Sequence, residues 1–357
     1  MISAKVLIML TILVYLGGMI IIGIYCSKKN ENVGDFYLGG RKLGPFVTAM
    51  SAEASDMSSY LLMGLPGLAY LSGVADVGWT AIGLAIGTYL NWLVVAKKIR
   101  IYTHRLDAIT IPDFFSRRYH DEKNILMCIA AVVIIIFFIP YTASGFAACG
   151  KLFSTLFGVN YIPAMVISAI VIVLYTAMGG FLAASTTDLI QGIVMSIALL
   201  IIVFFGIHIA GGFDACLRID SPYGFLTICS TLAWALGYFG MPHILLRFMA
   251  IEDHNKLKLS RRIAVIWVVI AMGVAILIGI IGNAMTKVGA VPLLEGSASE
   301  TIIVCISDLL SKHGCLAAIV AGIVLSGILA ATMSTADSQL LAASSSISHN
   351  LLGGFFR

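Results

Sequence analysis

Nine apolar stretches of roughly 20 residues constrain this chain more than any other feature of its sequence. A helix needs about 20 apolar residues to cross the hydrocarbon core of a bilayer, and the stretches do not alternate as the strands of a membrane β-barrel do. We therefore expect an all-α integral membrane protein embedded in the lipid bilayer. The predicted spans are 6–26, 45–72, 77–96, 125–149, 160–178, 186–210, 223–246, 262–286 and 314–350.

The composition excludes the main soluble classes. Hydrophobic residues make up 60% of the 357 residues and charged residues only 11%, whereas a soluble domain carries about 25% charged residues. Disordered chains and nucleic-acid-binding proteins need low hydrophobicity or clustered exposed charge, so neither class fits.

Basic residues gather in alternate loops. Of the 22 Lys and Arg, four lie in 27–44, seven in 97–123, five in 247–262 and one at Arg357, which leaves five elsewhere. Because basic loops stay in the cytoplasm, this partition predicts an outside N-terminus, a cytoplasmic C-terminus and an outside segment at 287–313 in the cell membrane.

Two of the predicted spans contain interruptions. The second has a polar run from Ser51 to Tyr60 within 28 residues, and the seventh has Gly237, Gly240 and Pro242 within six. Glycine and proline also occur in ordinary membrane helices, where they serve packing. A pair of broken helices five spans apart and opposite in direction, however, is typical of the binding site of an inverted-repeat transporter.

This spacing predicts a single transporter domain over 1–357 built from two inverted halves. Spans two to six form the first half, at about 45–210, and spans seven to nine form part of the second, at about 223–357. We expect a five-plus-five, leucine-transporter-type core that lacks its last two helices. Because alternating access needs a complete scaffold, we also expect residues 1–357 alone not to transport.

Acidic residues inside spans are costly and usually functional. Asp56 is the strongest candidate because it lies in the broken second span, and Glu53 is three residues away on the same helical face or turned towards the cytoplasm. Asp188 either faces a partner or caps the start of span six after Ser185 and Thr187. Asp337, in span nine, has no predicted role.

Span nine presents a group of oxygen atoms. Ala331, Ser334 and Thr335 are spaced i, i+3 and i+4, so one carbonyl and two hydroxyls share a helical face. Several neutral oxygens close together suit a sodium ion, although small and hydroxylated residues also serve close helix packing.

Five long motifs carry a resemblance to a known family. The chain resembles the sodium:solute symporter family, closest to its sodium/proline members, from about residue 6 to Leu351. The motifs, in order, are SAEASDMSSYLLMGLPG, FFIPYTASG, GGFLAASTTDLIQG, LGYFGMPHILLRFMA and ILAATMSTADSQLL.

This resemblance implies roles for particular residues. It implies sodium as the co-transported ion and L-proline as the substrate, with no other metal, no cofactor and no catalytic residue. The implied sodium ligands are the carbonyls of Ala54, Met57 and Ala331 and the hydroxyls of Ser334 and Thr335. The implied coupling residues are Asp56, Ser58, Arg41 and Asp188. The implied substrate residues are Tyr60, Gly64, Tyr141, Trp234, Tyr238 and Pro242.

Three features depart from the family pattern. Tyr60 stands where the proline carriers typically have tryptophan, Glu53 replaces an uncharged residue, and the loop at 211–223 is short. Tyr60 keeps an aromatic wall but adds a hydroxyl, which bears on affinity and substrate choice. Glu53 would alter the charge balance near sodium, and neither change removes an implied ion ligand.

The leading functional hypothesis is a sodium-coupled symporter for L-proline. Pantothenate, a sugar or another amino acid are alternative substrates within the same class. A channel would need a continuous pore, and a membrane enzyme would need a nucleophile, a base and an orienting group, which the sequence does not present together.

Overall fold

The computed structural model describes residues 3–212 and 224–355 of the chain, so most of the loop at 211–223 lies outside the described residues. The described residues form helices and no β-strand, which confirms the predicted all-α class. The elements are α1 (Ala4–Ser27), α2 (Val33–Leu38), η1 (Gly39–Arg41), α3 (Pro45–Met57), η2 (Tyr60–Gly64), α4 (Leu65–Ser72), α5 (Val74–Val94), α6 (Ala96–Arg105), α7 (Ile111–Arg118), α8 (Ile125–Phe157), α9 (Tyr161–Ala210), α10 (Phe225–Ala233), η4 (Trp234–Gly240), α11 (Pro242–Ala250), η5 (His254–Lys256), α12 (Leu257–Lys287), η6 (Gly296–Thr301), α13 (Ile302–Ser311), α14 (Cys315–Ser345) and η7 (Ser346–Phe355).

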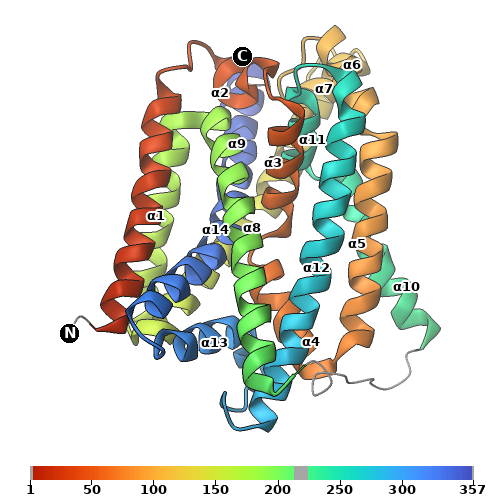
Figure 1. Cartoon of the computed structure of the whole chain (residues 1–357). Helices are drawn as coiled ribbons and strands as arrows, with labels where there is room; N and C mark the ends of the chain where they lie inside the picture. Colours follow the sequence, from red (N-terminus) through yellow and green to blue (C-terminus); the bar gives the residue numbers. More distant parts are fainter. Residues whose placement is uncertain (1–2, 213–223, 356–357) are drawn as a thin grey trace.

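The long helices form an upright bundle with short helices at both ends (Figure 1). Six described helices are long and apolar enough to cross a membrane, and the bent pair Phe225–Gly240 and Pro242–Ala250 makes a seventh. A helix pairs its own backbone N–H and C=O groups, and it must do so because hydrocarbon offers them no hydrogen-bond partner.

Helix α9 contains two of the predicted spans. Its 50 residues would extend about 75 Å if straight, more than twice the thickness of the hydrocarbon core. The chain bends at Gly180, where φ is +58°, and Figure 1 shows two rods that meet at the end occupied by α2. A Cβ at Gly180 would lie 2.7 Å from the Phe36 carbonyl oxygen, so only glycine fits this bend.

The broken second span consists of α3, η2 and α4, each too short to cross by itself. Every predicted span thus coincides with a helix, part of α9 or a broken helix. The count of nine crossings, and the side of the membrane on which each terminus lies, stay predictions.

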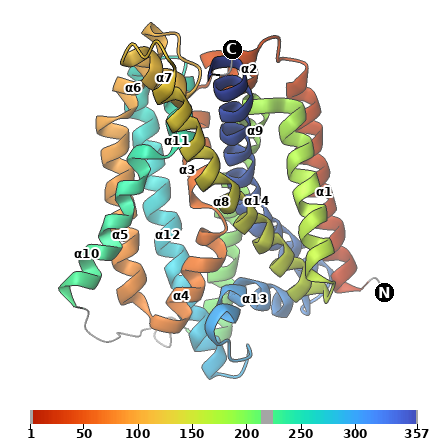
Figure 2. The ribbon, with the colours of Figure 1, turned by 180° about the vertical axis from the view of Figure 1, so that it is seen from behind.

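Helix α14 lies at the centre of the bundle and is buried over two thirds of its apolar length, whereas α1 is buried over less than a quarter. It packs against α9, α8, α1 and α3. Figure 2 shows α8 crossing the back of the bundle diagonally, while α10 stands at the side and has no buried residue. The broken element η2 packs against the central helix α14, whereas η4 packs mainly against α5.

Candidate functional site

The first helix break exposes backbone groups in the middle of the bundle. Helix α3 ends at Met57, Ser58 has a positive φ of 51°, and the chain continues through a single π-helical turn from Tyr60 to Gly64. The last carbonyls of a helix have no partners within that helix, so they can accept from groups outside it or bind a ligand. The sequence predicted this break correctly, because the polar run from Ser51 ends at Tyr60.

The second break is also where the sequence predicted it. The chain tightens to a 3₁₀ helix from Trp234 to Gly240, Met241 is extended, and Pro242 begins α11 at an angle of 48°. Proline is favoured at the first turn of a helix because its missing N–H has no partner to lose there.

The two breaks meet at a small cavity of about 80 Å³, which we call the inner chamber. Its lining comes from α3, η2 and η4 together with α5 and α8. The lining residues are Asp56, Met57, Ser58, Tyr60, Leu84, Tyr141, Trp234, Gly237, Tyr238 and Met241. Both breaks thus line one cavity, and its use as a binding site stays a prediction.

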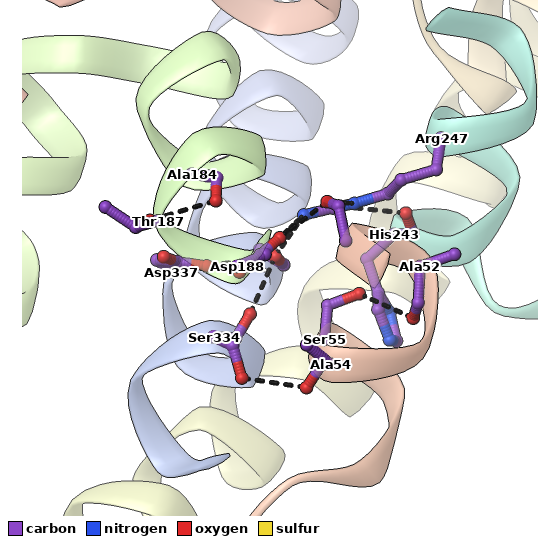
Figure 3. Close-up of polar contacts among 12 residues, drawn as sticks. Ala52, Ala54, Ser55, Ala184, Thr187, Asp188, His243, Arg247, Ser334 and Asp337 are labelled. Atoms are coloured by element: carbon purple, nitrogen blue, oxygen red, sulfur yellow. Dashed lines mark hydrogen bonds and ion pairs between the residues drawn. The ribbon is translucent and has the colours of Figure 1, made fainter. Parts of the chain in front are cut away.

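A cluster of oxygen atoms lies beside the inner chamber, where α14 packs against α3. The Ser334 hydroxyl donates to the Ala54 carbonyl over 2.7 Å, although the two residues are 280 positions apart, and Figure 3 shows them facing each other. Ser334 and Thr335 also share the Ala331 carbonyl, at 3.2 and 3.3 Å. Four of the five implied sodium ligands are therefore hydrogen-bonded in one group.

The chemistry of this cluster suits a monovalent cation. All four residues are buried and their oxygens are neutral. A cation takes the lone pairs of carbonyls and hydroxyls, so rotation of the Ser334 proton away from Ala54 would turn two bonded oxygens into two ligands. The fifth implied ligand, Met57, is the last residue of α3 and lines the inner chamber.

Asp56 joins the inner chamber to the second break. Its buried carboxylate interacts with the Tyr238 side chain on η4, while the Ser58 side chain interacts with Tyr141 on α8. The Ser58 hydroxyl also accepts from the Tyr60 backbone N–H at 3.1 Å. Three implied substrate residues are thus tied to two implied coupling residues.

A buried ion pair lies on the other side of the oxygen cluster. Arg247 on α11 donates to Asp188 on α9 over 2.9 Å, and both side chains are essentially inaccessible (Figure 3). Ser51 on α3 contacts both residues, because its hydroxyl donates to Asp188 at 2.6 Å and accepts from Arg247 at 3.0 Å. This network connects α3, α9 and α11.

Two sequence interpretations are corrected by this network. Asp188 does not cap a helix, because α9 resumes directly after Gly180 and Asp188 lies well inside it. Arg247, counted with the basic loop at 247–262, is a buried residue of α11. A single arginine within an apolar stretch was the available signal, since such a residue needs a buried acidic partner.

Asp337 is also held inside the bundle. Its carboxylate accepts from the Tyr175 hydroxyl over 2.7 Å and from the Ser338 hydroxyl over 2.9 Å. Ser338 in turn accepts from Arg247 at 2.5 Å. Asp337 therefore joins the Arg247 network to α9 and α14, a role that the sequence did not predict.

Glu53 points into the bundle rather than to the cytoplasmic side. It is buried, and its carboxylate accepts a hydrogen bond from the Trp92 indole N–H over 2.9 Å. Asn91, the residue before Trp92 in α5, donates to the Tyr238 carbonyl over 2.9 Å. Two consecutive residues of α5 thus hold one broken span each.

A larger cavity of about 660 Å³, which we call the vestibule, adjoins the inner chamber. Ser58, Tyr60, Tyr141, Trp234 and Met241 line both spaces. The other lining residues are Ser59, Met63, Gly64, Ser144, Ala147, Ala148, Lys151, Tyr161 and Glu300. Small-molecule sites usually measure about 300–1,000 Å³, so the vestibule has the volume of a binding site.

Most of the implied substrate residues border these two cavities. Tyr60 and Trp234 meet edge to face between them, with ring centroids 5.0 Å apart. Gly64 lines the vestibule, and Tyr141 and Tyr238 line the inner chamber. Pro242, the first residue of α11, lines neither cavity. The residue before it, Met241, lines both.

Arg41 does not contact the oxygen cluster. Its guanidinium donates to the carbonyls of Thr103, Ala108 and Met249, which fastens η1 to α6 and α11. Burial, together with the charge of Arg100, lowers the pKa of Arg41 to about 10, so the residue stays charged at neutral pH. Arg41 therefore ties η1 to the neighbouring elements without touching the implied ion ligands.

Among the described residues, no group of three His, Cys, Asp or Glu could hold a metal ion. The ion ligands proposed above are hydroxyls and carbonyls, which suit sodium rather than a transition metal.

Known proteins with the same pattern are membrane symporters. The model of the sodium:solute symporter family matches residues 36–357. The chain is 42% identical over 364 residues to the sodium/proline symporter of Escherichia coli K12, covering 98% of this chain and 71% of that protein. It is 41% identical over 356 residues to the osmoregulated proline transporter OpuE of Bacillus subtilis 168, covering 96% and 70%.

A solved structure shares the fold. The Na+-coupled sialic acid symporter, in a substrate-bound outward-open state, matches with a TM-score of 0.80 at 18% identity, covering 97% of this chain and 73% of that chain. At this identity the match bears on the architecture alone.

Proposed function

Because this chain belongs to the sodium:solute symporter family, a family of membrane transporters, we propose that it couples sodium to the uptake of L-proline. The observation that supports this most strongly is the meeting of the two helix breaks beside the Ala54 and Ser334 oxygens. The relatives named as proline carriers support the choice of substrate.

We propose that sodium binds between α3 and α14. The ligands would be the carbonyls of Ala54, Met57 and Ala331 and the hydroxyls of Ser334 and Thr335. Because these atoms belong to two different elements, sodium would hold α3 against α14. Asp56, one residue before Met57, would relay this change to Tyr238 in the substrate chamber.

The substrate would lie between the two breaks. An L-proline molecule has an apolar ring and two opposite charges, and the chamber offers the aromatic rings of Tyr141, Trp234 and Tyr238 together with the Asp56 carboxylate. The inverted halves at about 45–210 and 223–357 would move against each other to expose this chamber to each side in turn.

The test is binding and uptake of labelled L-proline by the purified full chain. Binding in detergent is compared in sodium and in potassium, and uptake is measured in vesicles with an imposed sodium gradient. Sodium-stimulated binding that L-proline analogues displace is the expected result. Asp56→Asn is expected to abolish it, while Glu122→Gln, an exposed residue, is the control.

Two other outcomes would change the proposal. Sodium-stimulated binding of pantothenate, a sugar or sialic acid without competition by L-proline would retain the symporter and reject the substrate. Downhill flux without sodium coupling would indicate a channel.

A further inference from the structure

Two charged residues face each other at the end of the vestibule away from the inner chamber. Lys151 on α8 and Glu300 on η6 form an ion pair of 2.7 Å, and Lys151 also donates to the Ser297 carbonyl. They are the only Lys, Arg, Asp or Glu residues that line the vestibule in the described parts of the chain.

The vestibule is longer than one small amino acid. Tyr141, Ser144, Ala148 and Lys151 follow one face of α8, from the inner chamber to the ion pair. Ten residues of helix measure about 15 Å. A ligand at Tyr141 therefore leaves room for a second small molecule beside Lys151.

The opposite wall is built from the broken span and η6. A Cβ at Gly67 on α4 would lie 2.9 Å from the Glu300 backbone nitrogen, so glycine lets η6 rest directly on α4. Glu300 is thereby held against the broken second span, which also carries Tyr60 and Gly64. Its carboxylate therefore has a defined place, in contact with the Lys151 ammonium group.

We propose that Lys151 and Glu300 form a vestibule site for a zwitterionic amino acid, in which Lys151 contacts the carboxylate and Glu300 contacts the ammonium group. This inference rests on the proposed function and extends it, because the site lies on the path to the inner chamber. The substrate would wait here until the Tyr60 and Trp234 rings separate.

The exposure of the pair favours this role over a purely structural one. The Lys151 and Glu300 side chains are 28% and 44% accessible, and partly exposed ion pairs contribute little to stability. A zwitterion can replace both partners at once with two charged contacts of its own. An uncharged sugar cannot, so the site would select amino acids before they reach the chamber.

The first experiment measures binding at the vestibule without transport. In a Tyr238→Ala background, which weakens the inner chamber, L-proline binding is measured by calorimetry. We expect Lys151→Gln and Glu300→Gln each to weaken it about fivefold or more. Lys312→Gln and Asp308→Asn, which break an exposed pair on α13, are the controls and should change it less than about twofold.

Analogues of L-proline show whether Lys151 and Glu300 contact the ligand or only hold α8 and η6 together. Lys151→Gln should weaken L-proline but not prolinamide, which lacks the carboxylate, and Glu300→Gln should weaken L-proline but not N-acetylproline, which lacks the ammonium group. Equal effects on all three ligands, or no effect on any, would overturn the proposal.

The second experiment measures uptake in vesicles. We expect Lys151→Gln to raise the KM for L-proline while kcat and the sodium concentration for half-maximal uptake stay unchanged. A fall in kcat at constant KM would show that the ion pair acts on the conformational change and does not bind substrate. If the parent protein shows neither sodium-stimulated binding nor sodium-stimulated uptake of L-proline, the proposed function is at fault, and the calorimetry still decides the vestibule site.

Discussion

Ser334 and Thr335 place two hydroxyls where α14 touches α3, and both are buried away from water. A cation bound there would have few other oxygens within reach. The free energy of ion binding should therefore depend on each hydroxyl separately.

Ser334→Ala or Thr335→Ala should raise the sodium concentration for half-maximal L-proline binding by one to two orders of magnitude, roughly 1.4–2.8 kcal/mol. The control is Ser326→Ala, whose buried hydroxyl bonds only the Gly322 carbonyl of its own helix. Unchanged sodium dependence in the Ser334→Ala, Thr335→Ala double variant would place the ion elsewhere.

The free energy of unfolding should depend on Arg247 and Asp188 as a pair, because each is a buried charge that needs the other. Arg247→Met should lower the free energy of unfolding by about 3–5 kcal/mol, since it leaves the Asp188 charge without its cation. Adding Asp188→Leu should recover much of this loss. Denaturation of the single and double variants in detergent measures the coupling, and strictly additive losses would contradict an ion pair that stabilises the fold.

Tyr60 lies at the boundary between the vestibule and the inner chamber, where its ring meets Trp234. Tyr60→Trp should retain or improve L-proline affinity, because it keeps the aromatic contact and restores the residue typical of the resembled proline carriers. Competition binding measures this, with Tyr60→Ala as the control that removes the ring. Loss of L-proline affinity in Tyr60→Trp would indicate a different substrate.

The bend of α9 shows how one residue shapes an element. Gly180→Ala should lower the free energy of unfolding by about 1–3 kcal/mol, because its positive φ and the nearby Phe36 carbonyl both oppose a side chain. Gly273→Ala in α12, with no atom within 4 Å of the new Cβ, should be neutral or stabilising. Thermal unfolding compares the two, and equal stability would show that the bend tolerates alanine.

Helix α5 couples the two broken elements through neighbouring residues. Asn91 donates to η4 and Trp92 donates to α3, so both breaks are hydrogen-bonded to the same helix. This connection gives Glu53, an unexpected carboxylate in the second span, a structural partner.

The molecule as a whole presents opposite ends to the two sides of the membrane. Figure 1 places α6 and α7, which carry many of the basic residues, at one end and α13 at the other. Single cysteines at the exposed positions Lys98 and Glu295 of a cysteine-free variant should therefore react from opposite sides. We expect an impermeant reagent to label only Glu295→Cys in intact cells, and labelling of both would refute the predicted orientation.

The sequence alone determined the membrane class and both breaks, because hydrophobic length, glycine, proline and polar runs act locally. It also placed Ala331, Ser334 and Thr335 on one face, since helical spacing is fixed. Only the tertiary structure brought Ser334 to Ala54, paired Arg247 with Asp188 and set Lys151 opposite Glu300. These contacts join residues far apart in the chain, and local spacing carries no information about which helices become neighbours.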